Sequence, residues 1–203
     1  MEAKWLSWAK TLQAMAQSGL AYTTNIYDRE RYEALRELSV EIMDTYTEAG
    51  TEKIKDLFCN EVGYQTPKID VRGALFKEQK VLLVKEKLDG LWSLPGGWAD
   101  VGLSIKDNVK KEMVEEAGLV IEPTRLVGIY DWTRNSKETP FSIYKAVMLC
   151  DYISGEFKDN IETEEIGYFG LDELPPLSHR VSYKMIEKSW HAYNDIEWMA
   201  EVD

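Results

Sequence analysis

The chain has 203 residues, a length that corresponds to one or two ordinary domains. Apolar residues make up 44% of it and charged residues 30%, a composition that indicates a globular protein and excludes disorder as its main state. The formal net charge of −12 repels bare polyphosphates and nucleic acid backbones, so a phosphate-bearing ligand would need local positive charge, most simply a divalent cation.

Residues 1–62 predict a small helical domain. Apolar residues recur at helical spacing up to Gly19, a natural end for a first helix, while Asp28 and Thr51 can cap a second and a third helix. A unit of roughly 60 residues is short for an independent core, and aromatic residues are enriched at interface cores. We therefore expect these helices to help form a symmetric homodimer, the alternative being that they pack only against the rest of their own chain. The aromatic residues concerned are Trp5, Trp8, Tyr22, Tyr27, Tyr32 and Tyr46.

Residues 63–203 predict a second domain of mixed strands and helices. Alternating apolar residues predict strands over residues 69–75, 81–85, 119–121, 126–130 and 141–149. Pro95 and two adjacent glycines predict a loop over residues 94–97. Ser104 with Asp107 resembles a capping box for a helix that ends at Gly118, and a polar loop over about 151–165 precedes a final helix over 181–193. Helices between mixed strands favour an α+β or α/β fold.

Three carboxylates converge on the predicted helix that ends at Gly118. Glu112, Glu115 and Glu116 fall within an arc of about 100° on a helical wheel. Glutamates this close repel one another in water, and a hard divalent cation such as Mg²⁺, which takes oxygen ligands, would explain the arrangement. The alternative is a solvated acidic face relieved by neighbouring lysines.

These glutamates belong to a longer pattern that resembles the Nudix box, which reads G, five residues, E, seven residues, then R-E-U-x-E-E-x-G-U with U aliphatic. The matching positions are Gly97, Glu112, Met113, Glu115, Glu116, Gly118 and Leu119. Two positions depart from the pattern, because Leu103 replaces a glutamate and Lys111 replaces the arginine. A lysine supplies a point charge in place of a bidentate fork, so we expect the glutamates to be aimed less rigidly.

The resemblance covers nearly the whole chain and extends to the bacterial Nudix subgroup with an N-terminal helical extension. That subgroup includes CDP-choline pyrophosphatases and proteins labelled ADP-ribose pyrophosphatases. The further segments that carry the resemblance are residues 4–9, 27–32, 63–68 and 94–102. It implies an α+β fold, a Nudix α/β/α sandwich with a mixed sheet that follows the small helical domain.

The resemblance also implies a reaction, the hydrolysis of the pyrophosphate bond in a nucleoside diphosphate linked to another moiety, of the CDP-choline or ADP-ribose type. In relatives the three box glutamates and the carbonyl of the Gly97 position hold the metal, here Mg²⁺ with Mn²⁺ as a substitute, which lowers the pKa of bound water. The family often places a general base on a later loop, and the candidates here are Glu162, Glu164 and Glu165. The alternative for these three is a plain acidic surface loop.

Other residues are candidates for contacts with the substrate. Arg72, in the first predicted strand, could reach a phosphate or pair with a glutamate of the box. His179 and His191 could act as an acid or a phosphate contact, although isolated histidines are more often structural. Four aromatic residues could stack on a nucleobase: Tyr22, Trp98, Tyr130 and Trp132.

Two other functions stay open at this point. One is the removal of pyrophosphate or nucleotides from RNA ends, which the missing basic stripe and the negative charge do not favour. The other is a catalytically weak nucleotide sensor, motivated by Leu103 and Lys111 and opposed by the intact glutamates. We expect no DNA partner.

The sequence predicts a cytoplasmic protein without a membrane partner. The longest uncharged apolar-rich stretch, residues 14–24, is about half of the roughly 20 residues that a membrane span needs. The first four residues do not form the start of a secretory signal. Cys59 and Cys150 are far apart and outside any CxxC spacing, so we expect two buried thiols.

Overall fold

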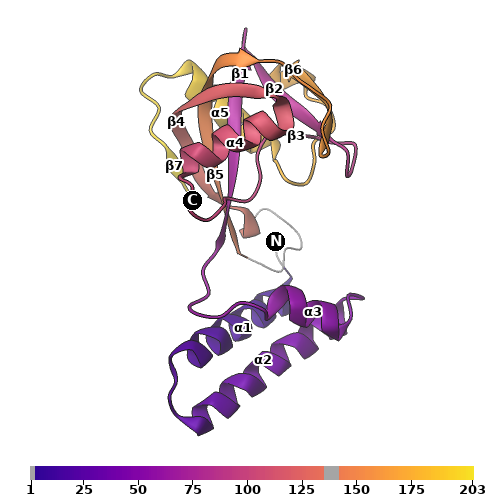
Figure 1. Ribbon diagram of the computed structural model, residues 1–203, viewed down its shortest axis with the longest axis vertical. Helices are drawn as coiled ribbons and strands as arrows, with labels where there is room; N and C mark the ends of the chain where they lie inside the picture. Colours follow the sequence, from indigo (N-terminus) through magenta and orange to yellow (C-terminus); the bar gives the residue numbers. More distant parts are fainter. Residues whose placement is uncertain (1–2, 135–141) are drawn as a thin grey trace. The chain divides into compact units, whose positions relative to one another are not determined.

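The computed structural model describes residues 3–134 and 142–203, which form two compact units (Figure 1). Of the described residues, unit 1 comprises 3–68, 131–134 and 142–143, and unit 2 comprises 69–130 and 144–203. The sequence places the boundary after residue 62, and in the structure residues 63–68 also belong to the unit that contains the helices. None of the helices in the described residues combines the length and the hydrophobicity of a membrane span.

Unit 1 contains the helices α1 (Lys4–Tyr22), α2 (Ile26–Tyr46) and α3 (Thr51–Phe58). The predicted cap of α2 is wrong, because the side chain of Asn25 accepts hydrogen bonds from the N–H groups of Tyr27 and Asp28 and α2 therefore begins before Asp28. The N-cap of α3 is Gly50, and Thr51 is already the first helical residue. Six residues form the buried core of this unit: Leu6, Ala9, Val40, Met43, Ile54 and Phe58.

Gly19 does not end α1, which continues to Tyr22. A Cβ atom at position 19 would lie 2.4 Å from the ring of Tyr32 on α2. The glycine therefore serves the close approach of the two helices, a role that a pattern within one helix does not reveal.

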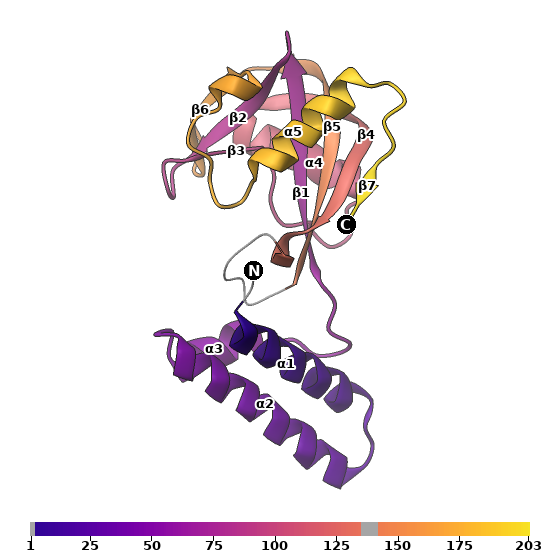
Figure 2. The same ribbon diagram turned by 180° about the vertical axis from the view of Figure 1, so that it is seen from behind.

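Unit 2 is built on a seven-stranded sheet with the order β3-β2-β1-β5-β4-β7, and β6 pairs with β2. The strands are β1 (Lys68–Lys77), β2 (Lys80–Glu86), β3 (Trp92–Ser93), β4 (Leu119–Asp131), β5 (Ile143–Gly155), β6 (Thr163–Phe169) and β7 (Glu201–Val202). Helix α4 (Ile105–Ala117) covers one face of the sheet and α5 (Tyr183–Asn194) the other, as the two opposite views show (Figures 1 and 2). The expected α/β/α sandwich with a mixed sheet is confirmed.

The strands differ from the sequence prediction in number and extent: β3 and β7 are not predicted, β6 begins at Thr163 inside the predicted polar loop, and β4 and β5 are longer than predicted. The strands predicted over residues 119–121 and 126–130 are one strand, β4, because Pro123 does not interrupt it. Strand β7 pairs with β4 only at Gly128 and Ile129, so the proline occupies an edge position where its missing N–H is tolerated. Strand β5 extends to Gly155 into the predicted polar loop, and the predicted start of that strand at residue 141 lies outside the described residues.

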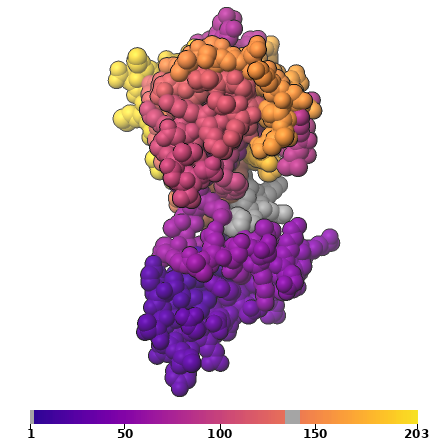
Figure 3. Space-filling view, viewed as in Figure 1, coloured from indigo at the N-terminus to yellow at the C-terminus, as the bar shows by residue number. Residues whose placement is uncertain are grey.

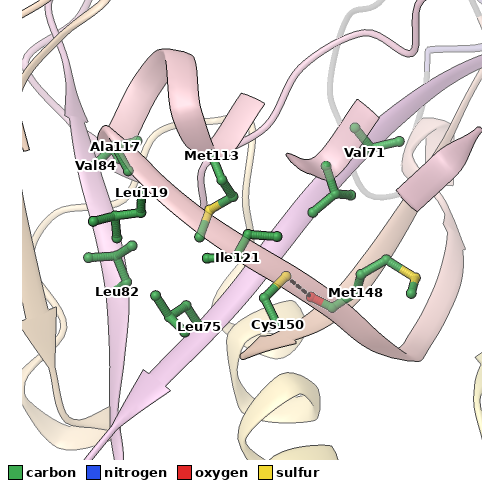
Figure 4. Close-up of a cluster of buried hydrophobic side chains, with 11 residues drawn as sticks. Val71, Leu75, Leu82, Val84, Met113, Ala117, Leu119, Ile121, Met148 and Cys150 are labelled. Atoms are coloured by element: carbon green, nitrogen blue, oxygen red, sulfur yellow. Dashed lines mark hydrogen bonds between the residues drawn. The ribbon is translucent and has the colours of Figure 1, made fainter. Parts of the chain in front are cut away.

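The main core lies between the sheet and α4 (Figure 4). Met113 and Ala117 point from the helix to the strands, as their spacing predicts. The helix begins at Ser104, whose Oγ accepts the N–H of Asp107, and ends at Gly118 with φ +70°, so both predicted ends are confirmed. The remaining buried residues of this cluster are Val71, Leu75, Leu82, Val84, Val109, Leu119, Ile121, Met148 and Cys150.

Candidate active site

The loop after β3 is hydrogen-bonded along β1. Gly73 donates its N–H to the carbonyl of Pro95 at 2.9 Å, and Val71 donates to the carbonyl of Gly97 at 2.8 Å. Gly96 has φ +145°, and a Cβ atom there would lie 1.9 Å from the carbonyl oxygen of Val71. Glycine is therefore required at position 96, and the loop is held in one conformation over the N-terminal half of the first strand.

Glu116 and Glu112 point from α4 toward this loop. The N–H of Gly96 donates to Glu116 Oε2 at 2.8 Å, and a Cβ atom at Gly97 would lie 3.0 Å from Glu112 Oε2. Burial raises the pKa of Glu116 to about 7, against the opposing effects of Arg72 and the Gly96 N–H. Burial also raises the pKa of Glu112. Burial therefore disfavours the charged form of both carboxylates, and a bound cation would stabilise it.

Lys111 forms ion pairs with Glu115, the remaining glutamate of the box, and with two neighbouring carboxylates. Its Nζ lies 2.8 Å from Glu115 Oε2, 3.3 Å from Asp100 Oδ2 and 3.4 Å from Glu112 Oε1. The hydrogen bond to Glu115 is the main cause that raises the pKa of Lys111. In residues 3–134 and 142–203, no three acidic, histidine or cysteine side chains lie close enough together to hold a metal ion in the present conformation. The box glutamates are candidate ligands because they are carboxylates and because α4 places them near one another.

Arg72 is buried behind the loop. Its guanidinium donates to both oxygens of Asp70, at 2.8 and 2.7 Å, and to the carbonyl of Leu94 at 2.9 Å. Lys145 Nζ lies 2.9 Å from the same aspartate. The predicted contact between Arg72 and a substrate phosphate does not fit this placement, because its side chain is only 2% exposed and each of its three nitrogens already donates to the protein. Arg72 instead supports the loop and favours the charged form of Glu116.

The three candidate bases do not all lie on the predicted loop: Glu162 directly precedes β6 and lines a cleft with Glu116, whereas Glu164 and Glu165 lie within β6. Lys85 Nζ lies 2.7 Å from Glu164 Oε1 and 4.0 Å from Glu165 Oε2, so these two carboxylates face β2. Glu162 faces a cleft of about 450 Å³ whose walls also include Glu116. The full lining is Glu86, Lys87, Leu88, Glu116, Ile161, Glu162 and Arg180.

Asn160 and Thr163 fix the segment that carries Glu162. Asn160 Oδ1 accepts the N–H groups of Glu162 and Thr163, at 2.9 and 2.8 Å. Asn160 Nδ2 and Thr163 Oγ1 both donate to the carbonyl oxygen of Glu116, at 3.2 and 2.6 Å. In Figure 3 the orange surface that includes this segment borders the rose surface of α4. The sequence reasoning missed both residues, although an asparagine in a polar loop is a known signal for such a turn.

Arg180 and Glu86 are the other cleft residues that the sequence reasoning missed. Arg180 Nη1 lies 2.5 Å from Glu86 Oε2, and the glutamate side chain is only 4% exposed. The two residues are far apart in the sequence and share no motif, so no spacing could have joined them.

The remaining candidates lie outside this cleft. Trp98 is 51% exposed, does not line this cleft, and forms an isolated antiparallel bridge with Asp70. His179 is exposed with Nδ1 3.9 Å from Asp89 Oδ2, and the ring of His191 packs edge-on against Trp190.

Both units match known protein families. Residues 3–58 match the family described as "UDP-X-like, N-terminal oligomerisation domain", and residues 66–189 match the NUDIX domain. The chain is 48% identical over 179 residues to the protein of Bacillus subtilis (strain 168) named "Putative ADP-ribose pyrophosphatase YjhB". The aligned region covers 88% of this chain and 86% of that protein.

The solved structures that resemble the chain include two with identities of 30% or more over most of their length. An ADP-ribose pyrophosphatase from Streptococcus suis 89-1591 is 46% identical with a TM-score of 0.64, over 68% of this chain and 100% of that one. A UDP-X diphosphatase is 30% identical with a TM-score of 0.65, over 98% of both chains. The second similarity includes the helical unit as well as the sheet.

Proposed function

The chain belongs to the Nudix hydrolase family and hydrolyses nucleoside diphosphates linked to another moiety, and we propose that it does so in the cleft between Glu116 and Glu162. The observation that carries this proposal is the shared cleft itself. It brings a glutamate of the Nudix box and a glutamate of the late loop into one water-accessible space. Hydrolysis of a diphosphate needs both a cation site and a proton acceptor near the attacked phosphorus.

The cation site in this proposal is the acidic face of α4. Glu112, Glu115 and Glu116, with the carbonyl of Gly97, offer oxygen donors only, which suits Mg²⁺. The loop fits this use, because position 97 has no side chain at the place where a Cβ atom would lie against Glu112. Bound there, Mg²⁺ would neutralise phosphoryl oxygens and lower the pKa of coordinated water.

The proton acceptor in this proposal is Glu162. Glu162 takes a proton from the attacking water, while Asn160 holds the backbone of its segment in place. Glu164 and Glu165 are poorer candidates because both face Lys85.

The substrate that we favour is an ADP-ribose-type conjugate. The two relatives near half identity carry the name ADP-ribose pyrophosphatase, whereas the UDP-X diphosphatase is more distant. The test is product analysis with ADP-ribose, CDP-choline, a UDP-linked sugar and triphosphorylated RNA, each with Mg²⁺ and with Mn²⁺. We expect AMP and ribose 5-phosphate from ADP-ribose as the fastest reaction, and faster release from the RNA would contradict the proposal.

The chain acts as a homodimer in this proposal, and α1 provides the contact. Trp8, Met15 and Tyr22 on this helix are 60%, 56% and 71% exposed. Together with Leu12, they lie at the spacing of a coiled-coil seam on a side of α1 away from its buried residues. The helix carries no acidic residue, so the seam is almost uncharged. We place the protein in the cytoplasm, where the free thiols of Cys59 and Cys150 would stay reduced.

A further inference from the structure

Arg180 is the cation in the cleft that is available to an anionic ligand. Lys87, the other basic residue of the lining, has its Nζ 2.6 Å from Asp159 Oδ1 and 2.5 Å from the carbonyl of Asn160. Arg180 makes one ion pair, through Nη1 to Glu86, and about a third of its side chain is exposed. In the described part of the chain, its other guanidinium nitrogens make no ion pair, so they can donate to a ligand in the cleft.

The backbone that carries Arg180 is held firmly against the sheet. Ser178 donates its N–H to the carbonyl of Trp92 at 2.8 Å, and its Oγ donates to Asp89 Oδ2 at 2.9 Å. The N–H of Arg180 in turn lies 3.5 Å from Ser178 Oγ. The guanidinium is therefore presented from a fixed segment and aimed by Glu86, and little ordering of the chain is needed before it binds.

The charges of the cleft require such a cation. Glu86, Glu116 and Glu162 line the same space, and a diphosphate would add further negative charge. A cation at the box glutamates would offset only part of this charge. A guanidinium offers a planar fork that matches two phosphate oxygens, which a lysine cannot reproduce.

We propose that Arg180 is a substrate contact that binds the diphosphate in the cleft lined by Glu116 of the Nudix box, with Glu86 as the residue that positions it. This inference rests on the proposed function, because it assigns a further contact in the same cleft. It also gives a physical reason for burying Glu86, since a buried carboxylate is costly unless it is paired.

Binding and turnover of the full-length protein test this contact. Arg180→Gln alone would leave Glu86 buried without a partner, so the main variant is the double change Arg180→Gln with Glu86→Gln, and Arg180→Lys accompanies it. The probe is a non-hydrolysable ADP-ribose analogue with a methylene group between its phosphorus atoms, titrated calorimetrically with Mg²⁺ present. We expect the double variant to bind the probe roughly 10- to 100-fold more weakly and to show a KM for ADP-ribose raised to match, because hydrogen bonds to charged groups contribute in this range. Arg180→Lys should recover part of the loss.

Lys184→Gln is the matched control, because it removes the same charge from an exposed position on the first turn of α5. Unchanged probe affinity in the folded double variant would overturn the proposal and leave Arg180 as a structural ion pair. An equal loss in Lys184→Gln would also overturn it, because the effect would then be general electrostatics. If the proposed function were wrong, the wild-type protein itself would cleave none of the conjugates, a result that differs from a loss confined to the variants. A wild-type protein that neither cleaves conjugates nor binds the probe would contradict both proposals.

Discussion

Gly96 donates its backbone N–H to Glu116 Oε2 at 2.8 Å, which joins the loop after β3 to the acidic face of α4. Both partners are fixed independently, the glycine by the hydrogen bonds of its loop to β1 and the glutamate by the packing of α4 on the sheet. The loop N–H therefore orients the carboxylate of a candidate metal ligand whose backbone is already fixed by α4.

Glu116→Gln should keep the fold and remove nearly all hydrolysis. The amide is isosteric and retains an acceptor for the Gly96 N–H, but it lacks the charge that a cation requires. We expect kcat with saturating Mg²⁺ to fall by roughly 10³-fold, which corresponds to several kcal/mol of lost electrostatic stabilisation. Glu122→Gln, which changes a surface carboxylate paired with Lys110, is the control and should act like wild type. Turnover by Glu116→Gln at the wild-type rate would refute a metal site on this face.

Glu162→Gln should lower kcat by roughly 10² to 10⁴-fold and leave Mg²⁺ affinity nearly unchanged, the range expected for the loss of a general base. Glu164→Gln is the matched control two residues away, because its carboxylate faces Lys85 and not the cleft. Steady-state kinetics and Mg²⁺ titrations of both variants measure the difference. A large kcat loss in Glu164→Gln with none in Glu162→Gln would reverse the assignment.

Lys145 should make the stability depend on pH. Burial lowers its pKa to about 8 from an ordinary value of 10.5, so between these values the unfolded chain binds more protons than the folded one. The free energy of unfolding contributed by this group therefore rises with pH in that window and is lowest below pH 8. We expect the difference in unfolding free energy between wild type and Lys145→Met to grow from pH 8 to pH 10 and to stay flat from pH 6 to pH 7. Urea denaturation at each pH measures it.

The comparison with Lys145→Met isolates this group from others that titrate in the same window. Burial raises the pKa of Cys150 to about 12, which lowers the stability of both proteins above pH 9 and cancels in the difference. Parallel curves for the two proteins from pH 8 to pH 10 would show that Lys145 stays charged beside Asp70.

Trp8→Glu and Met15→Glu should each convert a dimer into a monomer. Both side chains are exposed in the single chain, so the changes should not disturb its core, but they place like charges on the proposed seam of α1. Leu38→Glu on α2 is the control, because Leu38 is 45% exposed and lies outside this seam. Sedimentation equilibrium gives the masses. A wild-type monomer, or a dimer that both seam variants retain, would exclude α1 as the contact.

Local signals predicted the part of the site that lies within one element. Ser104 and Gly118 mark the ends of α4 through short-range capping, and the spacing of the glutamates on that helix follows from its geometry. Asp70 and Arg72 are two residues apart on a strand and so share a face, a signal that could have identified their buried ion pair. The contact of Arg180 with Glu86 depends on how distant segments meet, which no local pattern contains.

Gly96→Ala and Gly97→Ala should fail in different ways, although the two residues are adjacent. At position 96 a methyl group would lie 1.9 Å from a backbone carbonyl oxygen, and φ is +145°, so the whole loop must move. The backbone conformation alone costs about 1 to 3 kcal/mol, and we expect a clear fall in Tm together with loss of activity. At position 97 the nearest atom is Glu112 Oε2 at 3.0 Å, the end of a side chain that can rotate away. Gly97→Ala should therefore keep nearly the wild-type Tm and lose activity through a displaced carboxylate. Calorimetric melting curves and kcat for both variants test this, and equal Tm values for the two alanine variants would contradict the proposed geometry of the loop.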